Sequence, residues 1–174
     1  GILDLIAAFE MIPGNDYELW VCGSGDGEEA LRMAEARDSR IHFLGQVERA
    51  EALALESQAT VLVNPRNPHS EYTKYSFPSK TLEYLLSGVP VVMYRLPGIP
   101  PEYEPWIQWI DGSGVLAMAQ KIMEICELDQ ESHSKLGEGA RQFAIENKNH
   151  MGQSRLVFDL VRKPIGSRPK RSEK

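Results

Sequence analysis

The sequence predicts an α/β fold in which a doubly wound parallel sheet is covered by helices on both faces. Two observations predict it. Short apolar segments recur along the chain and alternate with segments whose apolar residues have helical spacing. Several of the apolar segments also run into a glycine or proline turn. Because parallel strands need crossover connections, and these are usually helices, the alternation indicates a parallel sheet.

The elements follow in a regular order. The chain starts on a helix whose apolar stripe is formed by Ile2, Leu5, Ile6 and Phe9. Apolar runs predict strands over residues 17–22, 41–44, 60–63 and 89–93. Helices are expected between them, over residues 26–36, 48–57 and 79–87. The alternation then stops, and three successive helices are expected over residues 113–127, 131–147 and 151–161.

Length and composition fit one globular domain. The chain has 174 residues, of which 42% are hydrophobic and 25% are charged, which is enough to bury a core. We expect residues 1–161 to form this domain. The segment 162–174, RKPIGSRPKRSEK, is basic and contains prolines, so it is expected to be a disordered tail. Such a tail is either solvated or a weak tether to an anionic membrane.

Charge and cysteine content exclude several classes of protein. A net charge of -6 argues against nucleic-acid binding, which needs clustered Lys and Arg. Cys22 and Cys126 have no metal or redox spacing, so both are expected to be buried thiols in a reducing compartment. No signal peptide or bilayer-length apolar run is visible, and a cytoplasmic protein is expected. The abrupt start on a helical stripe, without Met, suggests a fragment.

Ligands of open parallel sheets bind outside the carboxyl ends of the strands. There, Gly23 and Gly25 in the segment GSGDG permit close approach of a ligand to the backbone. The segment lacks the full GxGxxG spacing, so a tight strand-to-helix turn explains it equally well.

The most informative segment is 72–90, YTKYSFPSKTLEYLLSGVP. Pro78 pre-sets the first turn of a helix, so the amides of Ser79 and Lys80 should be free at its positive end. Glu83 lies about 6 Å along the axis from Ser79 on the same face. A diphosphate with an attached ribose fits this pattern. The alternative is an ordinary helix start with an exposed Lys80–Glu83 pair. The helix should serve the core through its leucines (Leu82, Leu85 and Leu86).

The chain resembles the retaining glycosyltransferases of the large family 4 group, particularly bacterial capsule and surface-polysaccharide enzymes. The segments that carry the resemblance are, in order, LWVCGSGDG, IHFLGQV, ATVLVNPR, FPSKTLEYLLSGVPVV and LGEGARQFAIENKN. The resemblance spans Ile2 to about Val161. It implies a Rossmann-like domain that is the C-terminal half of a GT-B fold, with an N-terminal acceptor domain in the same protein.

The resemblance also implies a function. A retaining, hexosyl-type transferase would move a sugar from a UDP- or GDP-linked donor to a glycan or lipid-linked acceptor, without a metal or other cofactor. Its work would be polysaccharide biosynthesis, in the cytoplasm or at the inner face of the membrane. The donor phosphate would take the acceptor proton while the start of the 79–87 helix stabilises the departing diphosphate.

Individual residues are carried over from the family in the same way. Glu83 matches the carboxylate that binds the ribose hydroxyls, and with Lys80 it is the candidate catalytic pair. The candidate donor-binding residues are Gly23, Gly25, Gln46, Val47, Tyr75, Pro78, Ser79, Lys80 and Glu83. Among them, the backbone of Gln46 and Val47 should border the base, and the two glycines should wall the cleft.

Two departures from the family pattern stand out. Tyr75 replaces a glutamate that in many members contacts the transferred sugar, and Glu71 would substitute only in a rearranged loop. The chain also starts after the strand that the family places in the middle of its sheet. Either another segment fills that position or the sheet is split. We therefore expect weak donor binding and no turnover by this chain alone.

Other interpretations remain open. A nucleotide-sugar epimerase shares the architecture and the donor site. A non-catalytic domain that binds a nucleotide or a partner protein is the second alternative, and Tyr75 is its best support. His42 is expected to pack and His69 to lie on a loop. Trp106 and Trp109 are expected to pack at the domain edge or, less simply, to stack on a ligand.

Overall fold

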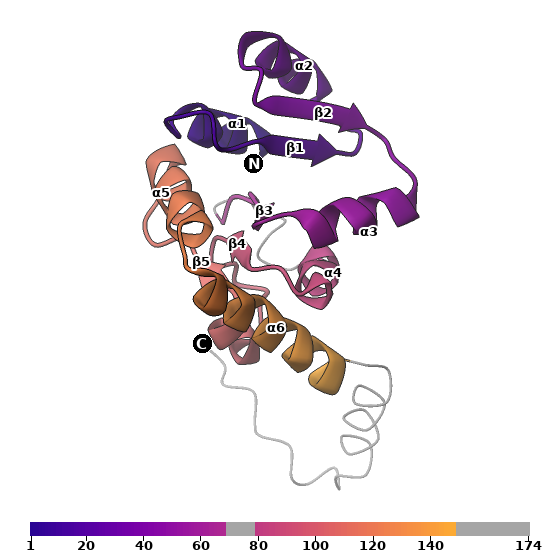
Figure 1. Ribbon diagram of the computed structural model, residues 1–174, viewed down its shortest axis with the longest axis vertical. Coiled ribbons are helices and arrows are strands. Elements are labelled where there is room, and N and C mark those ends of the chain that lie inside the picture. The colour runs from indigo at the N-terminus through magenta and orange to yellow at the C-terminus, as the bar shows by residue number, and fades with distance from the viewer. Residues whose placement is uncertain (69–78, 149–174) are drawn as a thin grey trace, which may run out of the picture.

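The computed structural model describes residues 1–68 and 79–148, and it shows helices and parallel strands in alternation (Figure 1). In chain order the elements are α1 (Ile2–Glu10), β1 (Leu19–Cys22), α2 (Glu28–Arg37), β2 (Ile41–Gly45), α3 (Arg49–Gln58), β3 (Leu62–Asn64), α4 (Ser79–Ser87), β4 (Val91–Met93), a 3-10 helix η2 (Pro101–Trp106), β5 (Gln108–Trp109), α5 (Val115–Cys126) and α6 (Gln130–Asn147).

The strands form two parallel sheets. β1 pairs with β2, with Leu19 opposite Ile41. β3, β4 and β5 form the second sheet, in which β4 pairs with β3 on one side and β5 on the other. The predicted α/β class with parallel strands is therefore confirmed. In the described residues the sheet is split, which is one of the two outcomes that the sequence left open.

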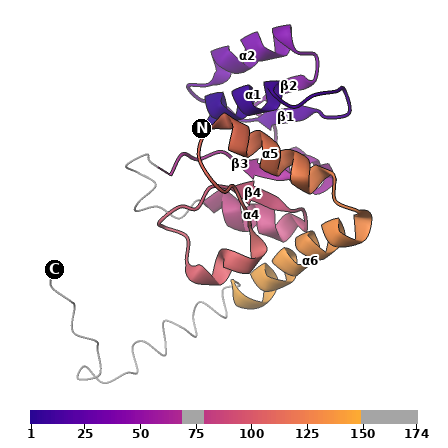
Figure 2. The ribbon, with the colours of Figure 1, turned by 90° about the vertical axis from the view of Figure 1, so that its left-hand side faces the viewer.

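Helix α1 contacts a segment that follows a strand of each sheet. The first residues of α1 pack closely against the loops that follow β1 and β3. A Cβ added at Gly1 would come within 2.4 Å of the Pro65 carbonyl oxygen, and one added at Gly27 would come within 2.5 Å of the Ile2 side chain. Along its length α1 packs on α2 and α5 (Figure 2). The carboxyl ends of β1 and β3 are thereby held on the same side of the molecule.

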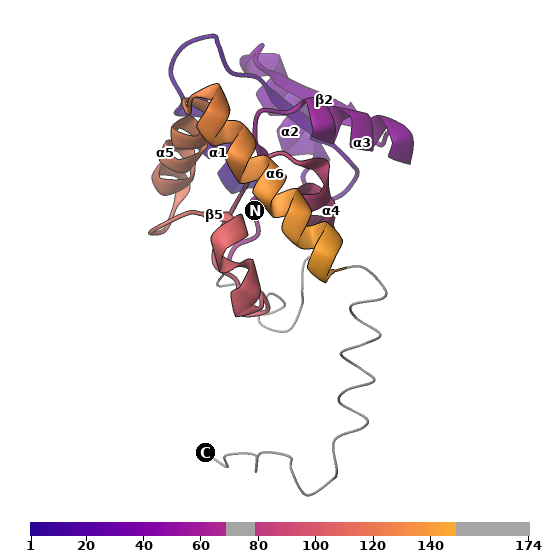
Figure 3. The same ribbon diagram turned by 60° about the horizontal axis from the view of Figure 1, so that its bottom comes forward.

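The core fills the space between these elements. All residues of β4 are fully buried, and Leu5 and Phe9 of α1 belong to the same cluster as Met118 and Ile122 of α5. On the other side α6 crosses α4 (Figure 3). This crossing is close, because a Cβ at Gly137 would lie 1.9 Å from the carbonyl oxygen of Gly88. The helix therefore needs a glycine at this point.

The sequence analysis did not predict two short elements, η2 and β5. Both tryptophans of this region pack, as expected. Trp109 is a buried residue of β5, and its Nε1 donates a hydrogen bond to the Glu104 carbonyl at 3.0 Å. Trp106 stacks on the Phe143 ring of α6, with 5.4 Å between the centroids. The expected packing of His42 is also seen, since its ring lies 4.9 Å from that of Trp20.

Three burial predictions need correction. Cys22 is exposed, because alternate residues of β1 point away from the helices that cover the strand. Cys126 is only half-buried at the end of α5, where burial raises the pKa of its thiol to about 11. In α4, Leu85 is fully buried, but Leu86 is 44% exposed because it lies on the outer side of the helix.

Some predictions lie outside the described residues. They concern His69, Glu71, Tyr75 and Pro78, the helix over residues 151–161 and the tail over residues 162–174. Within the part of the chain that is described, no helix has the length and apolar character needed to cross a membrane.

Candidate functional site

Two glycine turns meet at the carboxyl ends of β1 and β2. The amide of Gly23 donates a hydrogen bond to the carbonyl of Gly45 at 2.7 Å. Both have positive φ, +131° and +66°, where only glycine is comfortable. A Cβ added at either would meet no atom of the described part of the chain within 4 Å, so no described residue fills the space beside the two turns. The predicted base-bordering residues Gln46 and Val47 follow directly.

The amide of Gly25 has a different kind of hydrogen-bond partner from that of Gly23. Its amide donates to the Glu28 carboxylate at 3.2 Å, so this N–H already has a partner in the first turn of α2. A Cβ at Gly25 would also meet nothing within 4 Å. Gly25 can therefore border a ligand, but its amide serves the tight turn.

Helix α4 begins at Ser79, as the sequence predicts, and both Ser79 and Lys80 are exposed. A buried polar pair fixes this start against the sheet. Asn64, the last residue of β3, donates from its side-chain amide to the Thr81 hydroxyl at 3.4 Å, and this hydroxyl lies 3.8 Å from the Met93 sulfur at the end of β4. The start of α4 is thus anchored at the carboxyl ends of β3 and β4.

Four charged side chains from α3 and α4 meet in what we call the α3–α4 cluster: Arg49, Glu56, Lys80 and Glu83. The Lys80 ammonium donates to Glu83 and also to Oε1 of Glu56, at 3.2 Å. The other Glu83 oxygen lies 3.7 Å from the Arg49 guanidinium. The predicted Lys80–Glu83 pair therefore exists, and the structure adds two residues of α3 to it.

The environment shifts the pKa values of the two carboxyl groups of this cluster in opposite directions. The hydrogen bond from Lys80 holds the pKa of Glu83 below its usual value. Burial raises the pKa of Glu56 above its usual value, against the opposing effect of Lys80. Burial also lowers the pKa of Lys80, but the bonds to Glu83 and Glu56 outweigh it and the net shift is upward.

Three members of the cluster, Arg49, Glu56 and Glu83, line a groove of about 680 Å³ between α3, α4 and α6. This volume is typical of small-molecule sites. Its walls carry carboxylates, cations, hydroxyls and leucines, from Arg49, Leu53, Glu56, Ser57, Ser79, Leu82, Glu83, Leu86, Ser87 and Arg141. Within residues 1–68 and 79–148, no three His, Cys, Asp or Glu side chains gather in a metal-binding arrangement.

Sequence reasoning missed Arg49 and Glu56. Their spacing of two helical turns puts them on one face of α3, which was a usable signal. That this face turns toward α4 depends on tertiary packing, which no local pattern in the sequence specifies.

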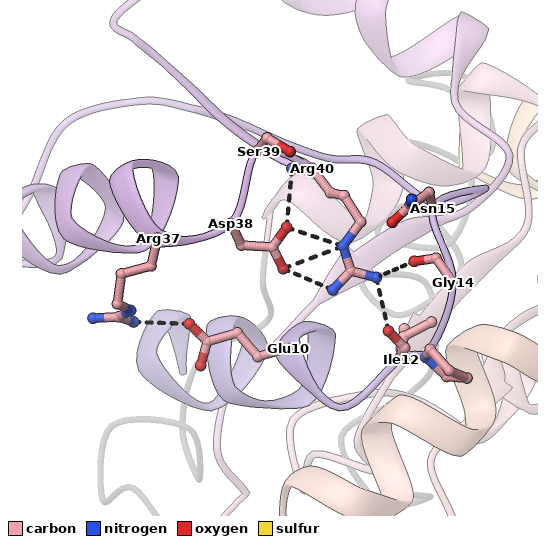
Figure 4. A pocket seen from close by; sticks show the side chains of 9 residues that line it. Glu10, Ile12, Gly14, Asn15, Arg37, Asp38, Ser39 and Arg40 are labelled. Carbon is pink, nitrogen blue, oxygen red and sulfur yellow. Dashed lines mark hydrogen bonds and ion pairs between the residues drawn. The ribbon is translucent and has the colours of Figure 1, made fainter.

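A second hollow, of about 540 Å³, lies where α1 and α2 end (Figure 4). Arg40 dominates it. Its guanidinium donates to both oxygens of Asp38 and, at 2.7 Å each, to the carbonyls of Ile12 and Gly14. It also lies over the Phe9 ring, at 4.9 Å from the centroid. We call this arrangement the Arg40 clamp, because it ties the end of α1 to the turn before β2.

Comparisons with known proteins agree with this architecture. The model of the family "Glycosyl transferases group 1" matches residues 1–127. A search by sequence against curated proteins finds no significant match.

Solved structures are similar in fold. HepE from Anabaena, crystallised in complex with UDP, superposes with a TM-score of 0.70 at 18% identity over 92% of this chain and 44% of HepE. WaaG, a glycosyltransferase involved in lipopolysaccharide biosynthesis, gives 0.68 at 17% identity, over 94% of this chain and 44% of WaaG. The pneumococcal O-GlcNAc transferase GtfA, in complex with UDP and GlcNAc, gives 0.58 at 18% identity, over 93% of this chain and 33% of GtfA.

The chain thus spans less than half the length of these structures. At such low identity they bear on the fold alone, which is that of the C-terminal half of a GT-B glycosyltransferase. The family match covers well over half of the chain, and on that ground the chain belongs to the group 1 glycosyl transferases.

Proposed function

We propose that the chain is the donor-binding domain of a retaining, hexosyl-type glycosyltransferase, which transfers a sugar from a nucleotide-sugar to a glycan or lipid-linked acceptor. One observation carries the proposal. Glu83 lines the groove and accepts a hydrogen bond from Lys80 at the exposed start of α4, which Asn64 anchors at the end of β3. The complexes of HepE and GtfA with UDP support a uridine diphosphate donor.

Each part of the donor has a group that suits it. The start of α4 offers amides and the Lys80 ammonium to the diphosphate, because a helix N-terminus favours anions. Glu83, one turn further, can accept hydrogen bonds from the two ribose hydroxyls. The base would lie along the backbone of Gln46 and Val47. Gly23 leaves room for the ligand beside this backbone.

The proposed chemistry depends on positioning and electrostatics. The acceptor oxygen would attack the anomeric carbon on the face from which the diphosphate departs, and a donor phosphate oxygen would take the acceptor proton. The negative charge that develops on the diphosphate would be met by the amides of Ser79 and Lys80 and by the Lys80 ammonium. These groups need no metal for that purpose. The acceptor would be held mainly by the N-terminal half of the whole protein, in the cytoplasm or at the inner membrane surface.

The donor site is tested by ligand-observed NMR with UDP, GDP and ADP on the wild-type chain, Glu83→Ala and Lys80→Ala. We expect contact with one nucleotide above the others, weakened in both variants. Glu131→Ala and Lys135→Ala are matched controls, because both residues are exposed on α6, away from the groove. Equal signals in all five proteins would refute the site.

Transfer itself is tested on the whole protein by product analysis. A new glycosidic bond supports the transferase. A free epimerised sugar would instead identify a nucleotide-sugar epimerase. Donor binding with neither product would point to a non-catalytic domain.

A further inference from the structure

Glu56 is a carboxylate of the groove that the proposed donor contacts do not use. Its side chain is only 11% exposed, compared with 23% for Glu83 and 55% for Lys80. Oε1 accepts the hydrogen bond from Lys80, while Oε2 is buried and, within residues 1–68 and 79–148, has no hydrogen-bond partner. A buried carboxylate with one satisfied oxygen is costly to keep ionised, and its single cationic partner must compensate.

The groups around Glu56 show how much depends on Lys80. From α4 it faces Lys80, Glu83 and Tyr84, and from β1 the thiol of Cys22. Arg49, on its own helix, reaches Glu83 instead. Among the described residues, Lys80 is therefore the one cation that forms an ion pair with Glu56.

Lys80 is also the cation that the proposed function assigns to the donor diphosphate. Its ammonium already contacts two carboxylates, those of Glu56 and Glu83. A diphosphate that approached it would add more negative charge at short range, which is unfavourable in a partly buried site. One of the two carboxylates must then either lose its contact with the Lys80 ammonium or become protonated. Glu83 retains Arg49 and would gain ribose hydroxyls, whereas Glu56 has neither.

We propose that Glu56 is a positioning residue that holds the Lys80 ammonium while the site is empty, and that donor binding moves this ammonium to the diphosphate while Glu56 takes up one proton from solvent. The proposal rests on the proposed donor site. No covalent bond changes except the O–H bond formed on Glu56.

The sign of the effect follows from linkage. The pKa of Glu56 is already raised by burial although Lys80 opposes the shift, so removal of Lys80 raises it further. Because the bound form holds the extra proton, donor affinity increases as pH falls. For one linked proton the steepest change is about tenfold per pH unit.

Calorimetry of UDP binding in buffers of different ionisation enthalpy measures this proton uptake. We compare the wild-type chain with Glu56→Gln and with Glu51→Gln, which removes an exposed carboxylate from the same helix. The wild type and Glu51→Gln should take up more protons than Glu56→Gln, by a difference approaching one. Above neutral pH, Glu56→Gln should bind UDP about tenfold more tightly than the wild type. The titration of UDP itself is common to all three and cancels.

Equal proton uptake in the wild type and Glu56→Gln, or weaker binding by Glu56→Gln, would overturn the proposal. Absence of UDP binding by the wild type would contradict the proposed function instead. A second measurement needs no nucleotide. In carbon-13 NMR of the side-chain carboxyls, Lys80→Met should move the titration of Glu56 to higher pH, whereas Lys135→Met should not. An unchanged Glu56 titration in Lys80→Met would overturn the proposal whatever the result with UDP.

Discussion

The Arg40 clamp and the α3–α4 cluster contain similar charged groups, but they differ in how well their hydrogen bonds are satisfied. The Arg40 guanidinium bonds both oxygens of Asp38 and two backbone carbonyls, and the two side chains are only 14% and 19% exposed. In the α3–α4 cluster two carboxylates share the half-exposed Lys80, and one buried oxygen of Glu56 has no hydrogen-bond partner among the described residues. The Arg40 clamp, whose charged groups all have hydrogen-bond partners, supports the fold. The α3–α4 cluster at the strand ends still has hydrogen-bonding groups that a ligand can engage.

The largest effect is expected from Arg40→Ala. The change leaves Asp38 and the carbonyls of Ile12 and Gly14 without their donor, and it should lower the free energy of unfolding by about 3 kcal/mol. Urea denaturation measures this loss. UDP affinity should be unchanged once the protein is folded. A loss below about 0.5 kcal/mol would show that the clamp is not structural.

Glu83→Ala should have the opposite effects, a loss of UDP affinity with little change in stability. Loss of the carboxylate that accepts the ribose hydroxyls should weaken UDP binding by tenfold or more, corresponding to about 1.5–3 kcal/mol. Its free energy of unfolding should change little, because the side chain lies at the groove surface. Titration calorimetry and urea denaturation of the same sample separate the two effects. A stability loss as large as that of Arg40→Ala, with normal UDP affinity, would make Glu83 a structural residue.

A smaller effect, on the stability difference between the wild type and Arg40→Ala, is expected from lowering the pH. The hydrogen bonds from Arg40 hold the pKa of Asp38 below its usual value. A depressed carboxyl pKa stabilises the fold above the pKa of the unfolded chain, about 4, and this contribution is lost as pH falls through the lower folded value. The stability gap between the wild type and Arg40→Ala should therefore narrow below about pH 4. A gap that stayed constant from neutral to acidic pH would contradict the assignment.

The smallest effect is expected from Glu10→Gln, at the rim of the same hollow. The Glu10–Arg37 ion pair is 2.8 Å long, but its side chains are 36% and 57% exposed. Exposed pairs contribute little because water screens them, so a change below about 0.5 kcal/mol is expected in urea denaturation. A larger loss would mean that proximity to the clamp, and not saturation of its hydrogen bonds, determines stability in this region.

Local patterns in the sequence were sufficient for the class of fold and for the start of α4. Alternating apolar and helical segments predicted the parallel strands, and the helix expected over residues 79–87 is seen as α4. The Lys80–Glu83 contact also followed from helical spacing alone. Each of these features depends on residues that are near neighbours in the chain.

Features that depend on packing between distant segments could not be predicted. Glu56 reaches Lys80 only because α3 packs on α4. Arg40 binds the carbonyl of Ile12, a contact between segments that meet only in the folded chain. β5 is too short to give a recognisable apolar pattern. The exposure of Cys22 depends on which side of β1 the helices cover, which periodicity does not specify.

The central claim is that a nucleotide binds in the α3–α4 groove and not at the Arg40 clamp. Amide chemical-shift mapping with UDP on the nitrogen-15-labelled chain tests it most directly. We predict that the largest shifts occur at Gln46, Lys80 and Glu83, and that Arg40 and Gly14 do not move. Shifts centred on the Arg40 clamp, with the start of α4 unaffected, would contradict the account.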